Sequence, residues 1–236
     1  MQIKLYGKIK KGATIIEGSP GFGLVGTIAT EYLIDHLDAK QVGNLWSEKL
    51  PAIVAVHGGE IIEPFAIFYD EKRNIVILRS IATVAGLEWE LADSALKLFK
   101  KIEAKELICV EGVGGMEKVS EPKVYHLSAN KEQKRKLEAI GLKQLNEGII
   151  IGSAASFLSK VKEALLIFAE SYSELPDSRA AAKIIEVLDK YLGLDVDYKP
   201  LIEKADKFER KVRELLSKCA MVKKAQDGKE GESYFG

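Results

Sequence analysis

The pattern of hydrophobic and polar positions predicts that the first two-thirds of the chain contains many short strands. Apolar runs recur there between glycines, prolines and charged residues, as is typical of strands in a sheet. The polar stretch 70–74 separates two of these runs and predicts a β-hairpin. Strands are expected at Gln2–Ile9, Ala13–Ile16, Gln41–Trp46, Ile53–Val56, Phe65–Tyr69, Ile75–Leu78, Leu107–Val110, Lys123–Leu127 and Gly148–Ile151.

Helical spacing of apolar residues predicts several helices between and after these strands. Val25, Ile28, Ala29 and Leu33 lie three or four residues apart, directly after a glycine-rich turn. Strands and helices alternate first, and a helical C-terminal part follows, which indicates an α/β fold with a single sheet flanked by helices. Helices are expected at Leu24–His36, Leu87–Ile102, Ala154–Ala169, from Pro176 to about Tyr191 with Gly193 as the stop, and from Pro200 onward.

The last expected helix is long and amphipathic. Its apolar positions are spaced alternately by four and three residues, which is a heptad-like seam, and its opposite face is charged. Such a seam fits a surface helix packed on its own sheet, and it fits a contact between copies in a homo-oligomer equally well. The seam consists of Leu201, Ala205, Phe208, Val212, Leu215, Cys219 and Val222.

The chain ends in a polar segment that closes on two aromatic residues. Residues 223–232 carry mostly charged and small side chains, which predicts a flexible tether, and Tyr234, Phe235 and Gly236 form its tip. Aromatic anchors beside a terminal carboxylate suit insertion into a pocket of a partner protein. The alternatives are a terminus of no consequence and one that folds back on its own domain. We therefore expect one α/β domain over residues 1–222 and a docking tail over 223–236.

Composition narrows the function classes. The 236 residues are 47% hydrophobic, enough for a substantial core, and 35 basic residues balance 35 acidic ones. Zero net charge argues against a protein that coats nucleic acid or an anionic membrane, and no apolar run is long enough for a membrane span. Two cysteines and no visible leader segment predict a cytoplasmic protein. A charged fraction of 30% leans toward a thermophilic source.

The motif Gly21-Phe-Gly-Leu-Val-Gly26 is the strongest candidate for a cofactor site. It fits the G-x-G-x-x-G pattern, follows an expected strand and opens an expected helix, which is the context of a dinucleotide site. Glu48 is the rough candidate for the acidic residue that should follow. The alternative is that Gly21, Gly23 and Gly26 permit a tight turn and close packing of helix on sheet. A nucleotide-binding α/β enzyme that uses this turn is the competing hypothesis.

Other polar residues predict structure rather than catalysis. Glu88 and Glu90 suit a helix dipole near a helix start, Asp177 has a similar place, and Ser153 suits a helix N-cap. Cys109 lies in an apolar run and is expected to be a small buried hydrophobe. The glycines of 111–115 fit a turn between a strand and a helix better than a ligand crevice. The glycine pair after His57 resembles an oxyanion loop, but the sequence has no G-x-S-x-G motif that would supply the nucleophile of a serine hydrolase. The spacing of His36, His57 and His126 is not that of metal ligands, so no metal site is predicted. We also predict no cofactor and no catalytic residue.

Several longer segments together resemble the proteasome assembly chaperone family of the second type, especially its archaeal members. The segments are Gly18-Ser-Pro-Gly-Phe-Gly-Leu-Val-Gly26 with Thr27–Leu33, Glu111-Gly112, Leu175-Pro-Asp-Ser-Arg-Ala-Ala-Ala182 with Leu188–Leu194, and Val196-Asp-Tyr-Lys-Pro-Leu-Ile-Glu-Lys-Ala205. The similarity spans about Ile15 to Leu216.

This resemblance implies a fold similar to that of nucleoside phosphorylases without a catalytic site. It implies a homo-oligomer that helps the proteasome α-ring assemble or that caps and activates the 20S particle. Some family members end in a hydrophobic–tyrosine–any-residue motif that inserts between α-subunits. Tyr234, Phe235 and Gly236 would take these three places, and Phe235 lacks the hydroxyl of the usual tyrosine.

Overall fold

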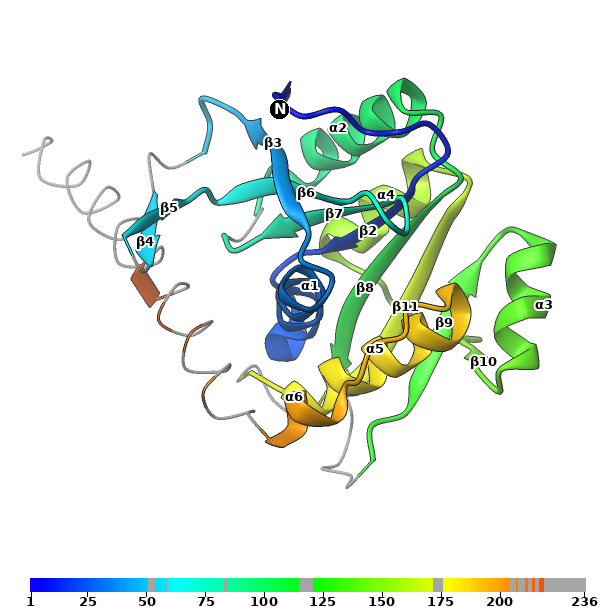
Figure 1. Ribbon diagram of the computed structural model, residues 1–236. Helices are drawn as coiled ribbons and strands as arrows, with labels where there is room; N and C mark the ends of the chain where they lie inside the picture. The colour runs from blue at the N-terminus through cyan, green and yellow to red at the C-terminus, as the bar shows by residue number, and fades with distance from the viewer. Residues whose placement is uncertain are drawn as a thin grey trace, which may run out of the picture.

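The protein is a mixed α/β structure built on one large sheet (Figure 1). The computed structural model describes residues 1–50, 54–57, 59–82, 85–114, 121–171, 176–203, 207, 211, 214 and 217–218. Within these residues the main sheet has nine strands in the order β1-β3-β6-β7-β2-β8-β11-β9-β10. The strands are β1 (Gln2–Leu5), β2 (Thr14–Gly18), β3 (Lys40–Trp46), β6 (Phe65–Asp70), β7 (Ile75–Ser80), β8 (Glu106–Gly114), β9 (Val124–Ser128), β10 (Lys143–Gln144) and β11 (Ala164–Ser171).

The centre of this sheet is parallel and its flanks are mixed. β2 runs parallel to both β7 and β8, and β8 runs parallel to β11. β6 pairs antiparallel with β7 and β3, which confirms the predicted hairpin around residues 70–74. β1 lies at the sheet edge, as expected, although it is shorter than the predicted strand. Parallel strands place their carboxyl ends at one edge, so β2, β8 and β11 all end there.

Helices cover both faces of the sheet and enclose two apolar layers. α1 (Val25–His36) and α5 (Ser178–Leu192) contact each other on one face, and α2 (Glu88–Lys101) and α4 (Gly152–Lys160) contact each other on the other. The first layer includes the fully buried Ile28, Leu33 and Leu188, and the second includes Leu98 and Phe157. α3 (Lys131–Ala139) packs on β9 and β10, and α6 (Lys199–Glu203) follows α5.

The expected helix over Ala154–Ala169 is wrong beyond Lys160. α4 ends there, and the apolar run that begins at Ala164 is the strand β11. β11 lies between β8 and β9, and both of its faces are almost entirely buried, so it has the continuous apolar sequence of a central strand. Apolar residues without a polar face carry no period, and spacing alone does not separate such a strand from a buried helix.

One further expectation in this part of the chain is wrong, and one helix was not expected. Residues 148–150 are not a strand, and Ile151 is the N-cap of α4. Helix α3 was not expected, because only Gln133 and Leu137 are buried in it and its apolar stripe is therefore narrow. Its start has a clear physical cause, since the Asn130 side chain accepts hydrogen bonds from the backbone N–H groups of the first turn.

A small hairpin stands apart from the main sheet. β4 (Ala55–His57) and β5 (Glu60–Ile62) pair antiparallel with each other and with no strand of the nine-stranded sheet. They lie in the connection from β3 to β6 and project to one side of the body (Figure 1). We call the hairpin and its flanking residues, 54–62, the arm.

The C-terminal part continues from α6 as a helix at each residue that is described. Residues 207, 211, 214, 217 and 218 have helical backbone. Across the described residues, no helix is both long and apolar enough to cross a membrane.

Candidate functional site at the glycine turn

The glycine turn joins β2 to α1 through the 3₁₀ helix η1 (Phe22–Leu24), and close backbone packing explains most of its glycines. A Cβ at Gly18 would lie 2.3 Å from the Gly26 carbonyl oxygen, and one at Gly26 would lie 2.3 Å from the Val110 carbonyl oxygen. A Cβ at Gly112 would lie 2.0 Å from the Phe22 carbonyl oxygen. These distances are far shorter than any real carbon–oxygen contact. The start of α1 therefore sits directly on β2 and β8, which only glycines allow.

The turn is also tied to the start of α5. Gly23 has a φ of +64°, and a Cβ there would meet the Ser171 hydroxyl at the end of β11. Ser171 Oγ donates to Asp177 Oδ2 at 2.9 Å, and the Asp177 backbone N–H donates to the Gly23 carbonyl at 2.9 Å. Asp177 Oδ1 accepts from the Ala180 N–H, so Asp177 is the N-cap of α5. Its expected place at a helix start is confirmed.

Two carboxyl groups lie beneath the turn on the opposite face of the sheet. Glu17 on β2 is opposite Cys109 on β8 in the parallel register, and Glu111 follows two residues later on the same face. Glu17 is 3% exposed and accepts a hydrogen bond from the Ser19 hydroxyl. A Cβ on Gly21 would lie 2.7 Å from Glu111 Oε1, so the turn passes directly over this carboxyl group.

Burial gives this pair unusual proton affinity. Desolvation raises the pKa of Glu17 to about 7, against the opposing effect of hydrogen bonds from Ser19 and Cys109. Desolvation, and then the charge of Glu17, raises the pKa of Glu111 to about 8. The Cys109 thiol is 2% exposed, and burial and both carboxyl groups raise its pKa well above normal. The expectation of a buried, unreactive cysteine is confirmed, since a thiol that keeps its proton is a poor nucleophile.

The topology around the turn does not form the unit that binds a dinucleotide. In that unit the strand after the first helix lies next to the first strand. Here the strand after α1 is β3, and β7 and β6 lie between it and β2. Glu48 is exposed in the turn that follows β3, several strands away from the glycine turn. The fold therefore separates the two parts of the motif that the nucleotide hypothesis combines.

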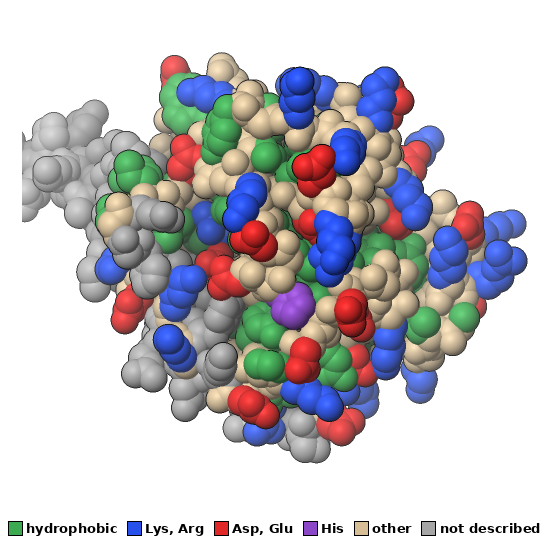
Figure 2. Space-filling model, viewed as in Figure 1, with side chains coloured by type: hydrophobic (Ala, Val, Ile, Leu, Met, Phe, Trp, Pro, Cys, Tyr) green, Lys and Arg blue, Asp and Glu red, His purple; other side chains and the backbone are tan. Residues whose placement is uncertain are grey.

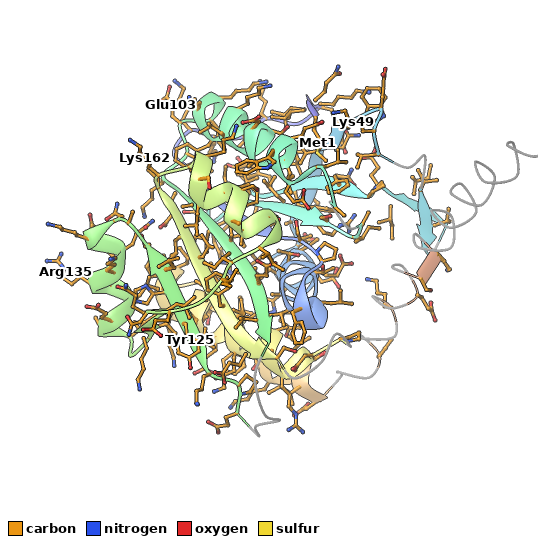
Figure 3. The ribbon with its side chains drawn as sticks, turned by 180° about the vertical axis from the view of Figure 1, so that it is seen from behind. Met1, Lys49, Glu103, Tyr125, Arg135 and Lys162 are labelled. Carbon is orange, nitrogen blue, oxygen red and sulfur yellow. The ribbon has the colours of Figure 1, made fainter. Side chains whose placement is uncertain are left out.

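The structure places the remaining polar candidates at helix ends. Ser153 is inside α4 and buried, because Ile151 takes the N-cap position instead, so the predicted serine cap is wrong. Glu88 and Glu90 lie in the first turn of α2, as expected. Glu90 accepts from the Met1 amino group at 3.0 Å and from Lys49 Nζ at 2.5 Å, and these bonds lower its pKa to about 2. Met1 and Lys49 lie together beside α2 in Figure 3.

The sequence did not identify three buried charged groups that position these elements. Arg79 at the end of β7 pairs with Glu31 of α1 at 3.2 Å, and both are nearly inaccessible. Lys211, in the C-terminal helical segment, reaches the other oxygen of Glu31 at 3.2 Å. Glu106 accepts hydrogen bonds from Tyr191 and Gln133 at 2.9 and 3.2 Å. A charged residue within or directly beside an apolar run, as at Glu17 and Arg79, is the feature of the sequence that could have identified such buried groups.

The structure separates the predicted interface residues. Leu201 is 1% exposed and packs in the apolar layer beneath α1 and α5, so its side chain is not available to another copy. Phe208, Val212 and Leu215 lie outside the described residues, as do Tyr234, Phe235 and Gly236 of the tail. Within the described part of the chain, His126 is fully buried and no group of three or more His, Cys, Asp or Glu side chains could hold a metal ion.

Comparison with known proteins connects the fold to a family. The chain superimposes on the crystal structure of Pyrococcus furiosus PbaA, an archaeal homolog of proteasome-assembly chaperone, with a TM-score of 0.84 and 28% identity over 94% of this chain and 100% of that one. It superimposes on P. furiosus PbaB, an archaeal proteasome activator, with a TM-score of 0.74 and 25% identity over 91% of this chain and 98% of that one.

Sequence comparison agrees with the structural match. An uncharacterized protein of Methanocaldococcus jannaschii is 27% identical over 206 residues, which is 85% of this chain and 84% of that protein. The sequence model of the PAC2 family matches residues 15–216, a range that contains the glycine turn, Glu17 and Glu111. The chain therefore belongs to the PAC2 family.

Proposed function

We propose that this protein is a non-enzymatic proteasome assembly chaperone or activator-like protein of the cytoplasm. Its partner would be the α-ring of the 20S proteasome, which it would bind as a homo-oligomer and partly through its C-terminal tail. The observation that carries the proposal is the match to PbaA, which extends over the whole of that chain and 94% of this one. The similarity to PbaB, described as a proteasome activator, favours the same class of partner.

The geometry of the glycine turn supports a structural role for its polar groups. Three of the polar side chains that line it are engaged with neighbours: Ser19 with Glu17, Ser171 with Asp177, and Asp177 with the backbone of α5. These bonds fix the start of α1 and α5 against the sheet. The cluster therefore has the properties of a packed junction, and we assign it no nucleic acid, membrane, metal or cofactor as a ligand.

The tail would supply part of the binding. Tyr234 and Phe235 are aromatic anchors beside a free carboxylate, and residues 223–232 form a long polar connection to the domain. Several tails on one oligomer would raise the effective concentration of each tail at the ring, so weak single contacts would still give stable binding.

Native mass spectrometry of the protein mixed with archaeal proteasome α-subunits tests this proposal. Full-length protein is compared with a variant that ends at Gly231. We expect a complex with the full chain and its loss after truncation. A complex that survives truncation would move the contact to the domain surface and remove the tail from the proposal. No complex with either protein would contradict the proposed function itself.

A further inference from the structure

The interior of the sheet contains one histidine that makes no polar contact. His126 on β9 is fully buried, and among the described residues neither Nδ1 nor Nε2 of its ring has a hydrogen-bond partner. Buried polar groups in native proteins are almost always paired, because burial without a partner costs free energy. This ring therefore needs an explanation, and neither the glycine turn nor the tail supplies one.

The ring lies between the sheet and α3. Side chains two residues apart on a strand point to the same face, so His126 shares a face with Ser128. The Ser128 hydroxyl donates to the side chain of Gln133 on α3, which identifies this face as the one that α3 covers. Within the sheet, His126 is in register with Ile167 of β11 on one side and with Gln144 of β10 on the other. Neither of these two neighbours carries a charge.

The charged groups that act on the ring belong to α3. Burial lowers the pKa of His126, the charge of Glu138 raises it, and the charge of Lys134 lowers it further. On β10, Lys143 is in register with Tyr125 and therefore lies on the opposite face. Figure 2 shows Lys and Arg side chains gathered at the right margin of the molecule, where Figure 1 places α3. Basic groups outnumber acidic ones on this helix, whose charged residues are Lys131, Glu132, Lys134, Arg135, Lys136 and Glu138.

α3 has little apolar attachment to the body. Its buried side chains are Gln133 and Leu137, and the helix packs chiefly on β9 and on β10, which is only two residues long. A polar link joins it to the centre of the sheet, since Gln133 Nε2 donates to the buried side chain of Glu106 on β8 at 3.2 Å. α3 stands at the margin of the molecule in both Figure 1 and Figure 3. Elements with few buried apolar side chains open at a lower free energy than the whole protein.

We propose that His126 is an acid-sensitive switch, in which uptake of a proton by the ring releases α3 and β10 while the rest of the sheet stays folded. In the closed state a charged ring would be buried without a partner, beneath a helix that is itself mainly basic. In the open state water solvates the charged ring. The inference is independent of the proposed function, because it involves neither the glycine turn nor the tail.

The surroundings allow the release to be local. A pocket bounded by Tyr125, Glu138 and Gln144 is open to solvent at the same edge, so a small movement of α3 brings water to the ring. β10 covers the outer backbone edge of β9, and the Leu145 N–H donates to the His126 carbonyl at 2.8 Å. Release of β10 would therefore turn β9 into the edge strand of the sheet, with unpaired backbone groups.

The direction of the response follows from the two states. In the closed state the pKa of His126 lies below its ordinary value of 6.5, which the ring regains when α3 opens. The attachment of α3 is therefore full above about pH 6.5 and weakens as the pH falls below that value. At about pH 5.5 the equilibrium between open and closed forms is shifted by up to about tenfold. Glu17 and Glu111 respond in the opposite sense, because their raised pKa values make acid stabilise the region of the glycine turn.

Hydrogen–deuterium exchange of the full-length protein, followed by mass spectrometry, tests the switch. Exchange in residues 124–145 is compared at about pH 7.5 and about pH 5.5, after correction for the intrinsic pH dependence of amide exchange. In wild type we expect the opening equilibrium of α3 and β10 to rise by up to about tenfold in acid, while β2 and α1 keep their protection. His126→Leu replaces the ring by an apolar side chain of similar size, and its opening equilibrium should change by less than about twofold.

His36→Gln is the matched control. His36 is exposed on α1, and the change leaves His126 in place, so α3 of this variant should open in acid as it does in wild type. If His126→Leu opened in acid as far as wild type, the response would not come from His126 and the inference would be wrong. It would also be wrong if acid left α3 of wild type closed, or if the whole sheet opened together with α3.

The pH profile of the wild-type protein gives a second measurement that needs no change at position 126. The opening equilibrium of α3 should be level above about pH 6.5 and should rise as the pH falls below it. A profile that stays level down to about pH 5, or one that rises only near the ordinary pKa of a carboxyl group, about 4, would contradict the switch.

Discussion

At the described residues the glycine turn is closely packed, whereas the arm exposes apolar side chains to solvent. At the turn, glycines bring the backbones of η1, α1 and β8 into contact, and Glu17 is buried so deeply that it holds its proton near neutral pH. At the arm, Val54, Val56 and Ile61 extend into solvent from a two-stranded sheet that lies outside the main one.

From this difference we expect the two regions to have different roles. In the proposed function, a rigid body would hold the projecting segments in fixed positions. The bonds between Gly23, Ser171 and Asp177 lock the body at the carboxyl edge of the sheet. Changes at the turn should therefore alter folding, whereas changes in the arm or the tail should alter association.

The largest effect is expected from Gly26→Ala. The new methyl group would lie 2.3 Å from the Val110 carbonyl oxygen and 3.1 Å from Gly18 Cα, and backbone atoms on both sides cannot move aside without separating α1 from the sheet. We expect the free energy of unfolding to fall by more than about 3 kcal/mol. Chemical denaturation followed by circular dichroism measures the loss.

Gly148→Ala is the matched control for this change. A Cβ at Gly148 would lie 3.6 Å from Leu145 Cδ2, which is an ordinary contact. The unfolding free energy of this variant should stay within about 0.5 kcal/mol of wild type. If Gly26→Ala were as stable as the control, the close packing that we assign to the glycine turn would be wrong.

A smaller effect, of about 3 kcal/mol, is expected from the pH dependence of Glu17. The folded protein holds this proton up to about pH 7, whereas an ordinary glutamate releases it near pH 4.5. Stability is therefore full below pH 4.5 and decreases as the pH rises through about 7. A shift of this size corresponds to about 3 kcal/mol lost across that window. Glu17→Gln carries no titrating proton at this position, so between about pH 5 and pH 8 its unfolding free energy should fall by about 3 kcal/mol less than that of wild type, while Glu111 still contributes its own loss.

Glu147→Gln serves as the control, since Glu147 is exposed and should leave the pH profile unchanged. The remaining pH dependence of Glu17→Gln would come largely from Glu111, whose pKa is itself raised in part by the charge of Glu17. Parallel profiles for wild type and Glu17→Gln would contradict the buried, protonated state of this carboxyl group.

Much of the fold could be predicted from the sequence because glycines, prolines and charged residues separate the apolar runs, and several helices have clear end signals. α1, α2 and α5 were located within a few residues, and Asp177 and Gly193 mark the two ends of α5. β11 could not be distinguished from a helix because both of its faces are buried. The failure lies where tertiary packing, rather than local spacing, decides between strand and helix.

The candidate site could be predicted only in part. The glycine motif was visible, but its purpose depends on β8, whose Val110, Glu111 and Gly112 come about 90 residues later and meet the turn only in the fold. The expected seam residue Leu201 lies in the core, because α6, which contains it, packs against α5. The exposed apolar residues of the arm were not predicted, because the local sequence of a two-stranded hairpin is the same whether or not the hairpin belongs to the main sheet.

The smallest effect is expected at the tip of the tail, and it concerns association alone. In the docking motif that the family resemblance implies, Phe235 would take the place of tyrosine, so Phe235→Tyr would add one hydroxyl group to the proposed docking contact. A hydrogen bond to this hydroxyl would strengthen docking by about 0.5–1.5 kcal/mol, which is roughly a twofold to tenfold lower Kd for α-subunits. The unfolding free energy should not change if the tail acts only in association, as the proposed function has it. Titration calorimetry against α-subunits measures the gain, with the variant that ends at Gly231 as the reference for binding without the tail. Equal affinity of Phe235→Tyr and wild type, with loss of binding on truncation, would mean that the tail binds through its rings and carboxylate alone. In that case a hydroxyl group at this position contributes nothing to docking, and the phenylalanine does not weaken it.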